Sequence, residues 1–337
     1  MQFALTAEQN LIAETARGLF GEFAPFLRAT IASEAGYDVG QWQRVTHEMG
    51  FGAIMLPEAE AGAGLGLVEL ALVTIEMGRT LFPSPFLPSI GAALPLLSGM
   101  PEIASGKTIA APAIGPGLRL EGDRLSGEAL VAFGHVADLF VAVVGDQAMA
   151  VPAAGAQVER LATMDVTRPL ARVRFDRVAV EVVGGAARAL DQARVVLAAE
   201  CVGGADAALA ATVAYAKQRI QFGRPIGSFQ ALKHRMADMM IAIEAARTAV
   251  YYAAAAMDEE DPAASEAAAI AHFTAIEVYQ MVSGNMIQLH GGIGFTWEHD
   301  AHLHFKRARS ATTLFGTPAE SRGRLAMLIG LDGQRAA

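Results

Sequence analysis

The 337-residue sequence contains one cysteine, few aromatic residues and little charge. Because Cys201 stands alone, an intrachain disulfide and a zinc site built from cysteines are both excluded, and a reducing cytoplasm is the expected location. Aromatic residues make up 7% of the chain and charged residues 18%. The core is therefore expected to consist mainly of alanine, aliphatic and methionine side chains.

Long apolar runs and an excess of positive charge are also missing. No run of 18 or more apolar residues occurs, so no membrane span is expected. The first twenty residues lack the basic segment and apolar block that are typical of a signal peptide. The formal net charge is −9, which leaves no excess of cations for phosphates and argues against nucleic-acid binding.

What the sequence does contain is alanine-rich, helix-forming chain on both sides of a β-rich middle. Residues 1–104 show helical spacing of apolar residues, and Thr6 with Gln9 forms a capping box. Residues 105–185 hold short β-branched runs separated by glycine and aspartate. Residues 186–337 are helical again. The pattern predicts an α+β fold, mainly α, with an N-terminal helical domain, a small middle β-domain and a C-terminal four-helix bundle.

Two local patterns resemble ligand sites but have simpler explanations. The segment GAGLG, residues 62–66, lacks the glycine spacing and the strand–turn–helix setting of a dinucleotide loop, so a glycine-rich connection is the preferred interpretation. The histidines at 299, 302 and 304 do not converge on one face of a helix, and basic residues follow them directly. No metal site is therefore expected.

Two stretches in the helical C-terminal segment contain residues suited to a flat, anionic ligand. In RIQFGRPIGSFQ, Arg219 to Gln230, Arg219 offers a fork of donors for phosphate and Phe222 can pack on a flat ring. Ser228 is the expected N-cap of the next helix. In QLHGGIGFTWEHD, residues 288–300, two glycines allow close approach of a ligand or another subunit. Taken separately, each stretch also fits an ordinary helix connection or C-cap.

Together, the two stretches resemble the C-terminal bundle of the acyl-coenzyme A dehydrogenase family. The segments GFGAIMLPEAEAGAGLG and EMGRTLFPSPF resemble the first domain of the same family, so the resemblance covers nearly the whole chain. It is most specific between residues 194 and 316. The resemblance implies FAD-dependent α,β-desaturation of an acyl-CoA thioester in β-oxidation. A carboxylate removes the α proton, the β hydrogen leaves as hydride to the flavin, and an electron-transfer flavoprotein takes the electrons.

The resemblance also implies which residues contact FAD. In this family the two motifs reach an FAD that is held mainly by a neighbouring subunit, and the arginine contacts the pyrophosphate. The helix break would thus present its side chains to a partner's flavin. Carried onto this sequence, the residues implied to bind FAD are Arg219, Gln221, Phe222, Gln230, Gln288, Gly291 and Gly292.

The sequence departs from the family at the catalytic base. The usual base is a glutamate directly before a Gly-Thr pair, and here that position holds Phe315. Other branches of the family place the base on an earlier helix, at the position of Ala193. Glu200 lies two helical turns past Ala193 on roughly the same face and is the best substitute candidate. The favoured alternative is that Glu200 is a carboxylate used in helix packing.

The middle segment departs from the family as well, because the segment that supports the flavin ring and the tryptophan-bearing strand are not recognisable. The chain keeps what it would lend to a partner's FAD and lacks what it would need to hold its own. It resembles the short subunit of α2β2 assemblies, some of which act on steroid side-chain CoA thioesters. A non-catalytic structural subunit and a degenerate homo-oligomeric dehydrogenase remain as alternatives.

Overall fold

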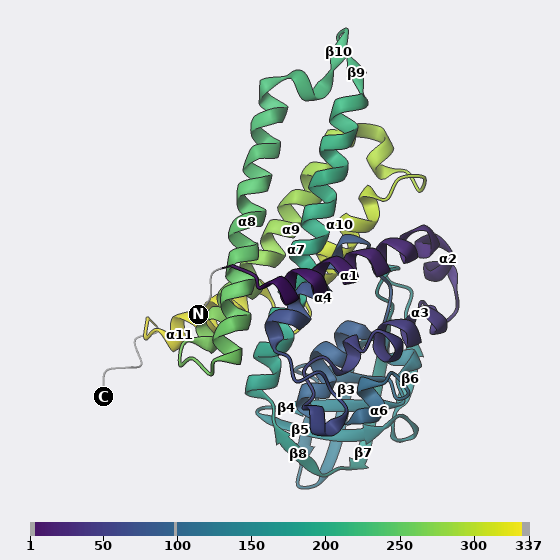
Figure 1. The fold of residues 1–337 in the computed structure, drawn as a ribbon. Coiled ribbons are helices and arrows are strands. Elements are labelled where there is room, and N and C mark those ends of the chain that lie inside the picture. The colour runs from purple at the N-terminus through teal and green to yellow at the C-terminus, as the bar shows by residue number, and fades with distance from the viewer. Residues whose placement is uncertain (1–3, 98–99, 332–337) are drawn as a thin grey trace. The chain divides into compact units, whose positions relative to one another are not determined.

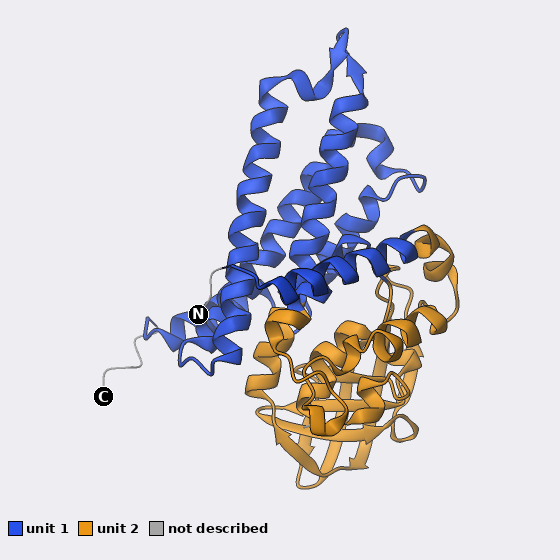
Figure 2. Ribbon diagram, in the orientation of Figure 1, with its two compact units in different colours: residues 1–24, 71–82, 197–337 blue, residues 25–70, 83–196 orange. Residues whose placement is uncertain are grey.

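The computed structural model describes residues 4–97 and 100–331, which form two compact units (Figure 2). Unit 1 comprises residues 1–24, 71–82 and 197–337, and unit 2 comprises residues 25–70 and 83–196. The chain is mostly helical, with a small β region between N-terminal and C-terminal helices (Figure 1). The predicted fold class is confirmed.

Unit 1 is a helical assembly built on the C-terminal half of the chain. The predicted capping box at the start of α1 is present, because the Thr6 hydroxyl accepts from the Gln9 backbone N–H and the Gln9 side chain accepts from the Thr6 N–H. A second capping box joins Thr317 and Glu320 at the start of α11. The helices are α1 (Ala7–Phe23), α4 (Leu67–Arg79), α7 (Ala187–Gln218), α8 (Gln230–Asp258), α9 (Ala264–His290), α10 (Ala301–Ala311) and α11 (Pro318–Leu328).

Helix α7 is the central helix of the chain and crosses α4 at backbone contact. A Cβ atom on Gly203 would lie 1.8 Å from the carbonyl oxygen of Ile75, and one on Gly78 would lie 2.1 Å from that of Glu200. Only glycine at these positions allows the two helices to approach so closely. Among the described helices, α7 alone is long and apolar enough to cross a membrane, but 78% of its apolar window is buried within the protein. It is therefore a core helix.

Unit 2 contains two four-stranded sheets. The first has the order β1-β4-β5-β8, with β1 and β4 parallel, and the second has the antiparallel order β2-β3-β7-β6. The strands are β1 (Ala110–Ile114), β2 (Arg119–Glu121), β3 (Arg124–Ala132), β4 (Leu139–Val144), β5 (Gln147–Pro152), β6 (Gln157–Arg160), β7 (Leu170–Ala179) and β8 (Val182–Gly185).

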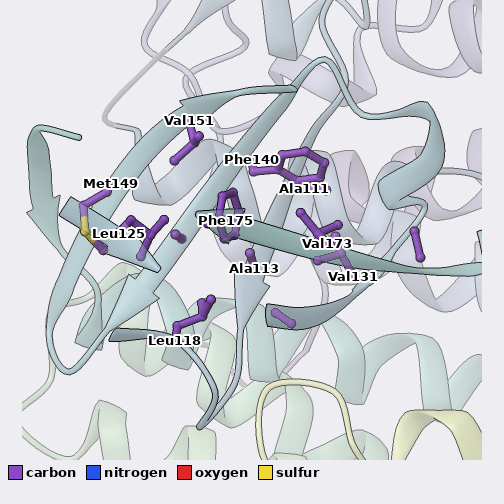
Figure 3. Close-up of a cluster of buried hydrophobic side chains, with 13 residues drawn as sticks. Ala111, Ala113, Leu118, Leu125, Val131, Phe140, Met149, Val151, Val173 and Phe175 are labelled. Atoms are coloured by element: carbon purple, nitrogen blue, oxygen red, sulfur yellow. The ribbon is translucent and has the colours of Figure 1, made fainter. Parts of the chain in front are cut away.

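The two sheets share one apolar core, in which small and large side chains alternate. Figure 3 shows Ala111 and Ala113 of β1 facing the same cluster as Phe140 of β4 and Phe175 of β7. The rings of Phe140 and Phe175 meet edge to face, with centroids 6.0 Å apart. Because side chains alternate between the faces of a strand, every second residue of these strands enters the core.

The remaining helical elements of unit 2 are short. They include α2 (Leu27–Ala32), α3 (Val39–Gln43), α5 (Leu94–Leu96), α6 (Pro101–Ala104), the π-helical turns Arg44–Glu48 and Leu87–Ala93, and several 3-10 turns. The first turns of α7 also belong to unit 2. There the Asp146 carboxylate accepts hydrogen bonds from the backbone N–H groups of Ala186 and Ala187, at 3.0 and 2.7 Å, and so fixes where α7 begins.

Candidate functional site

The first ligand-like stretch folds as a β-hairpin between α7 and α8. Strand β9 (Ile220–Gln221) pairs antiparallel with β10 (Arg224–Pro225). The two turn residues, Phe222 and Gly223, both have positive φ, at 52° and 76°, as in the two-residue turns that suit a hairpin twist. The hairpin projects past the ends of α7 and α8 in Figure 1. The break between α7 and α8 is thus a regular β-hairpin.

Phe222 occupies the tip of this hairpin. Its side chain is 92% exposed, and its backbone adopts a left-handed conformation that is costly for a bulky residue. The ring meets that of Phe229 edge to face, with centroids 6.2 Å apart, while the Arg224 guanidinium lies 4.1 Å from the Phe229 centroid. Its strain and exposure make Phe222 a candidate for contact with another molecule.

Three polar side chains near the two motifs are free to bind a ligand. Arg219, Gln230 and Gln288 are exposed, and their side chains make no hydrogen bond or ion pair with residues 4–97 or 100–331. Gln221 is exposed as well, but its amide donates to the carbonyl of Ile220 at 2.8 Å. The free groups are one cation and two amides, which fits a ligand with anionic and polar oxygens.

The start of α8 differs from the sequence prediction. Ser228 does not cap the helix, because it lies in the 3-10 turn Ile226–Ser228 and the N-cap residue is Phe229. Phe229 has no side-chain oxygen, so the first N–H groups of α8 gain no side-chain cap and add partial positive charge near Gln230.

The second ligand-like stretch begins where α9 ends. Gly291 has φ 64° and ψ −142°, a conformation that excludes most other residues, and it opens the 3-10 turn Gly291–Phe295. A Cβ atom on Gly291 or Gly292 would meet no described atom within 4 Å. The glycine pair therefore serves the turn and leaves the adjoining space open.

A cluster of three rings places the two motifs at the same end of the bundle. His290, which is 3% exposed, lies with its centroid 4.4 Å from that of Tyr215 on α7 and 4.4 Å from that of His299. Tyr215 is four residues before Arg219, and His290 directly precedes Gly291. Sequence analysis missed this cluster, although Tyr215 lies four residues before the first motif and both histidines lie within the second.

His290 has one hydrogen-bonded ring nitrogen and one that has no hydrogen bond within the described residues. Its Nδ1 lies 2.8 Å from the carbonyl oxygen of Met286 and must donate, because a carbonyl only accepts. Its Nε2 is buried and has no hydrogen-bond partner in the described part of the chain. Burial lowers the pKa of His290, and the nearby His299 lowers it further.

The histidines of α10 belong to the core. The Nδ1 atom of His304 lies 3.0 Å from the Tyr279 hydroxyl, and burial lowers the pKa of His304 to about 4. The Trp297 ring packs edge-on against His302 and carries the Lys306 ammonium on its face, 4.5 Å from the centroid. Among the described residues, no group of three or more His, Cys, Asp or Glu side chains could hold a metal ion.

Glu200 is an ion-paired carboxylate inside unit 1. It is 6% exposed, and its Oε1 lies 3.1 Å from Nη1 of Arg307, whose Nη2 donates to the carbonyl of Leu81 at 3.4 Å. This geometry supports the packing role that the sequence left open. A role for Glu200 as the catalytic base stays a prediction.

The two positions where the family resemblance places the base carry apolar side chains in this chain. Phe315 is 8% exposed and has a positive φ of 57°, and Gly316 follows it with φ 104°. Ala193 is completely buried on α7. Neither side chain can accept a proton.

Unit 2 contains a pocket of about 350 Å³ beside the first turns of α7. Its only charged lining residue is Arg188, and its described lining residues include no carboxylate. The walls come from the helical elements before the sheets and from the start of α7. The lining residues are Gly52, Ile54, Met55, Leu56, Leu70, Ile90, Leu94, Pro95, Gly185, Arg188, Ala189 and Gln192.

Comparison with known proteins matches both helical parts of the chain. The family described as "Acyl-CoA dehydrogenase, C-terminal domain" matches residues 183–329, and "Acyl-CoA dehydrogenase, N-terminal domain" matches residues 6–101. The acyl-CoA dehydrogenase IpdE2 of Mycobacterium tuberculosis is 39% identical over 327 residues, which cover 94% of this chain and 96% of IpdE2.

Two solved structures have the same fold over the whole chain. A variant of the steroid ACAD Tcur3481-Tcur3483 superposes with a TM-score of 0.89 at 31% identity, covering 97% of this chain and 98% of the other. A chain of the ChsE4-ChsE5 complex from Mycobacterium tuberculosis superposes with a TM-score of 0.88 at 27% identity, covering both chains completely. Both structures are described as pairs of proteins.

Proposed function

The chain belongs to the acyl-CoA dehydrogenase family of FAD-dependent oxidoreductases, and we propose that it is the short subunit of a heteromeric acyl-CoA dehydrogenase. The observation that carries this proposal is the hairpin that holds Phe222 outward at its tip with Arg219 free beside it. A chain that lends residues to a partner needs such a projecting element. The similarity to the Tcur3481-Tcur3483 and ChsE4-ChsE5 pairs supports the same assembly.

The residues of the two motifs fit a flavin dinucleotide held by a partner. Arg219 would bind the pyrophosphate, and the uncapped N–H groups at the start of α8 would favour the same anion. Phe222, Gln221, Gln230 and Gln288 would contact the rest of FAD, with Gly291 and Gly292 allowing close approach. When bound, FAD supplies the acceptor for the hydride that leaves the β carbon.

We further propose that the longer partner contributes the base. The two family positions hold Phe315 and Ala193, and Glu200 is already paired with Arg307. A base must reach the α proton within hydrogen-bond distance, and a buried ion pair has to break before its carboxylate can do so. Glu200 remains the alternative within this chain.

The proposed substrate is an acyl-CoA with a bulky, steroid-type acyl group. The pocket of unit 2, which is lined mostly by apolar residues, supports a compact ring-bearing group, and Tcur3481-Tcur3483 is described as a steroid ACAD. An electron-transfer flavoprotein is the proposed electron acceptor, as the family resemblance implies. A cytoplasmic location is proposed because Cys201 is a buried free thiol, which suits a reducing compartment.

The absorption spectrum of the purified protein tests the assembly. The chain should be colourless when expressed alone, and it should become yellow when purified with its longer homologue, at about one FAD per pair of subunits. Full flavin occupancy in the lone chain would instead favour a homo-oligomeric dehydrogenase with an unusual base.

Phe315 specifically favours one second candidate, a non-catalytic subunit that only stabilises its partner. In that case the Arg219→Ala variant should leave FAD retention by the complex unchanged. A lower FAD content in the same complex, with assembly intact, would exclude the purely structural role.

A further inference from the structure

We propose that the unit 2 pocket selects acyl-CoA substrates whose acyl group carries an oxygen acceptor at the end distant from the thioester, with Arg188 and Gln192 as the selecting residues. This inference rests on the proposed function and adds a substrate class to it. The twelve described lining residues all belong to unit 2, the part drawn in orange in Figure 2. The lone chain therefore supplies each of them.

The apolar side chains that line the pocket, together with its volume, determine which apolar group of a ligand fits. Ile54, Leu56, Leu70, Ile90 and Leu94 line it and are buried in the protein. A volume of about 350 Å³ is at the lower end of the usual range for small-molecule sites, which runs from about 300 to 1,000 Å³. Such a pocket suits a compact ring system or a branched chain.

Two hydrogen-bond donors on one face of α7 determine which polar group of a ligand is preferred. Arg188 and Gln192 are one helical turn apart on α7, so their side chains lie next to each other. In the described part of the chain, the only hydrogen-bond partner of the Gln192 amide is the Met55 sulfur, 3.6 Å from Nε2. A thioether is a weak acceptor, so the Gln192 amide would gain from an oxygen acceptor on the ligand. The Arg188 guanidinium, which also lines the pocket, adds positive charge that favours such an oxygen.

The distant end of the acyl group is the part that fits this pocket. Among the described lining residues there is no carboxylate and no other group able to remove a proton from carbon. The pocket therefore suits binding and selection, while proton removal takes place elsewhere. Two acceptor chemistries satisfy the same donors, a keto oxygen and a carboxylate, and the experiment separates them.

Three matched thioesters test the proposal by isothermal titration calorimetry: 3-cyclohexylpropanoyl-CoA, its 4-oxo analogue and its 4-carboxy analogue. We expect at least one oxygenated thioester to bind about ten to a hundred times more tightly than the plain one, the range expected for hydrogen bonds to charged groups. If the 4-carboxy analogue binds more tightly than the 4-oxo analogue, the pocket prefers a carboxylate. If both analogues gain the same affinity over the plain thioester, the pocket accepts any acceptor oxygen.

Two variants assign the effect to the named residues. Arg188→Met and Gln192→Leu should each reduce the preference for the oxygenated thioester while leaving the affinity for plain 3-cyclohexylpropanoyl-CoA within about twofold. Arg172→Met, which removes an exposed arginine from β7, is the matched control and should keep the full preference. Since Arg188 is exposed and Gln192 half-buried, these variants should fold, and their thermal unfolding verifies it.

The proposal is overturned if the three thioesters bind equally, if none binds the chain either alone or with its partner, or if the preference survives both pocket variants. These outcomes are independent of the assembly test. A lone chain that discriminates between the thioesters but never acquires FAD with a partner would keep this inference and remove the proposed function. A yellow, active complex that binds the three thioesters equally would keep the proposed function and remove this inference.

Discussion

Arg307 and Glu200 form an ion pair between α10 and α7, with both side chains less than a tenth exposed and their N and O atoms 3.1 Å apart. Two buried charges of this kind stabilise each other only as a pair, because either one alone would be a charge without compensation in a poorly solvated place. The pair therefore contributes to the stability of unit 1 whether or not the carboxylate also takes part in catalysis.

The variant Glu200→Gln separates these two roles. It should lower the free energy of unfolding by about 3–5 kcal/mol, because Arg307 loses its buried counter-charge. Turnover per bound FAD in the folded complex should stay within a few-fold of wild type. Chemical denaturation and steady-state assays measure the two effects.

An exposed pair supplies the control for this comparison. Glu277→Gln removes the partner of Arg322, in a pair whose side chains are 43% and 49% exposed, and should change stability by less than about 1 kcal/mol. If Glu200→Gln instead reduced kcat about a hundredfold at unchanged FAD content, Glu200 would be assigned as the base.

The strain at Phe222 predicts opposite effects on folding and on assembly. In Phe222→Gly the positive φ becomes unstrained, so the stability of the lone chain should stay within about 1 kcal/mol of wild type, the size of such backbone effects. The complex should nevertheless lose FAD or subunit contact, because the exposed ring is gone. Thermal unfolding of the lone chain measures the effect on stability, and size-exclusion chromatography of the complex measures the effect on assembly. A fully assembled, FAD-saturated complex would contradict the assigned role.

Arg219→Ala should weaken FAD binding by the complex about tenfold or more, because a charge-assisted hydrogen bond to phosphate is lost. The measurement is FAD retention during dialysis, followed by the flavin absorbance. Arg119→Ala removes the same charge from β2 in unit 2 and should leave retention unchanged. Equal FAD loss in both variants would point to a general effect of charge.

Acid should destabilise the protein through His304. Its pKa is lowered to about 4 in the folded state and lies near 6.5 in the unfolded state, so the unfolded state binds more protons between these values. Stability is thus fully present above about pH 6.5 and falls as pH drops towards 4, by on the order of 3 kcal/mol.

The variant His304→Asn removes this titrating group. Its melting temperature should change less between pH 7 and pH 4.5 than that of wild type. Part of the change in melting temperature with pH should remain, because burial also lowers the pKa values of His290 and His135. If the melting temperature of the variant changed with pH as much as that of wild type, His304 would not be the group that causes the acid destabilisation.

Local patterns in the sequence were sufficient for much of the fold. The capping box at Thr6 depends on residues three positions apart, and the β-rich middle is marked by short apolar runs, so both could be predicted. The prediction for Ser228 was wrong because a 3-10 turn follows the hairpin, and a cap depends on where the helix axis begins.

The site was only partly predictable for a related reason. Its two motifs stand out as sequence, but the contacts that arrange them join distant segments. Glu200 meets Arg307 across 107 positions, and Tyr215 meets His290 across a whole helical hairpin. Such pairs have no local signature, because each partner alone looks like an ordinary helical residue. The pocket of unit 2 was missed for the same reason.

The hairpin tip also determines how long an unassembled chain would survive. Phe222 is exposed, lies in a projecting turn, and is followed by glycine, which makes the Phe222–Gly223 bond an accessible cleavage point for a chymotrypsin-like protease. A partner that covers the tip would protect this bond. Surplus copies of the short subunit would then be cut first, so proteolysis would keep the amounts of the two subunits matched.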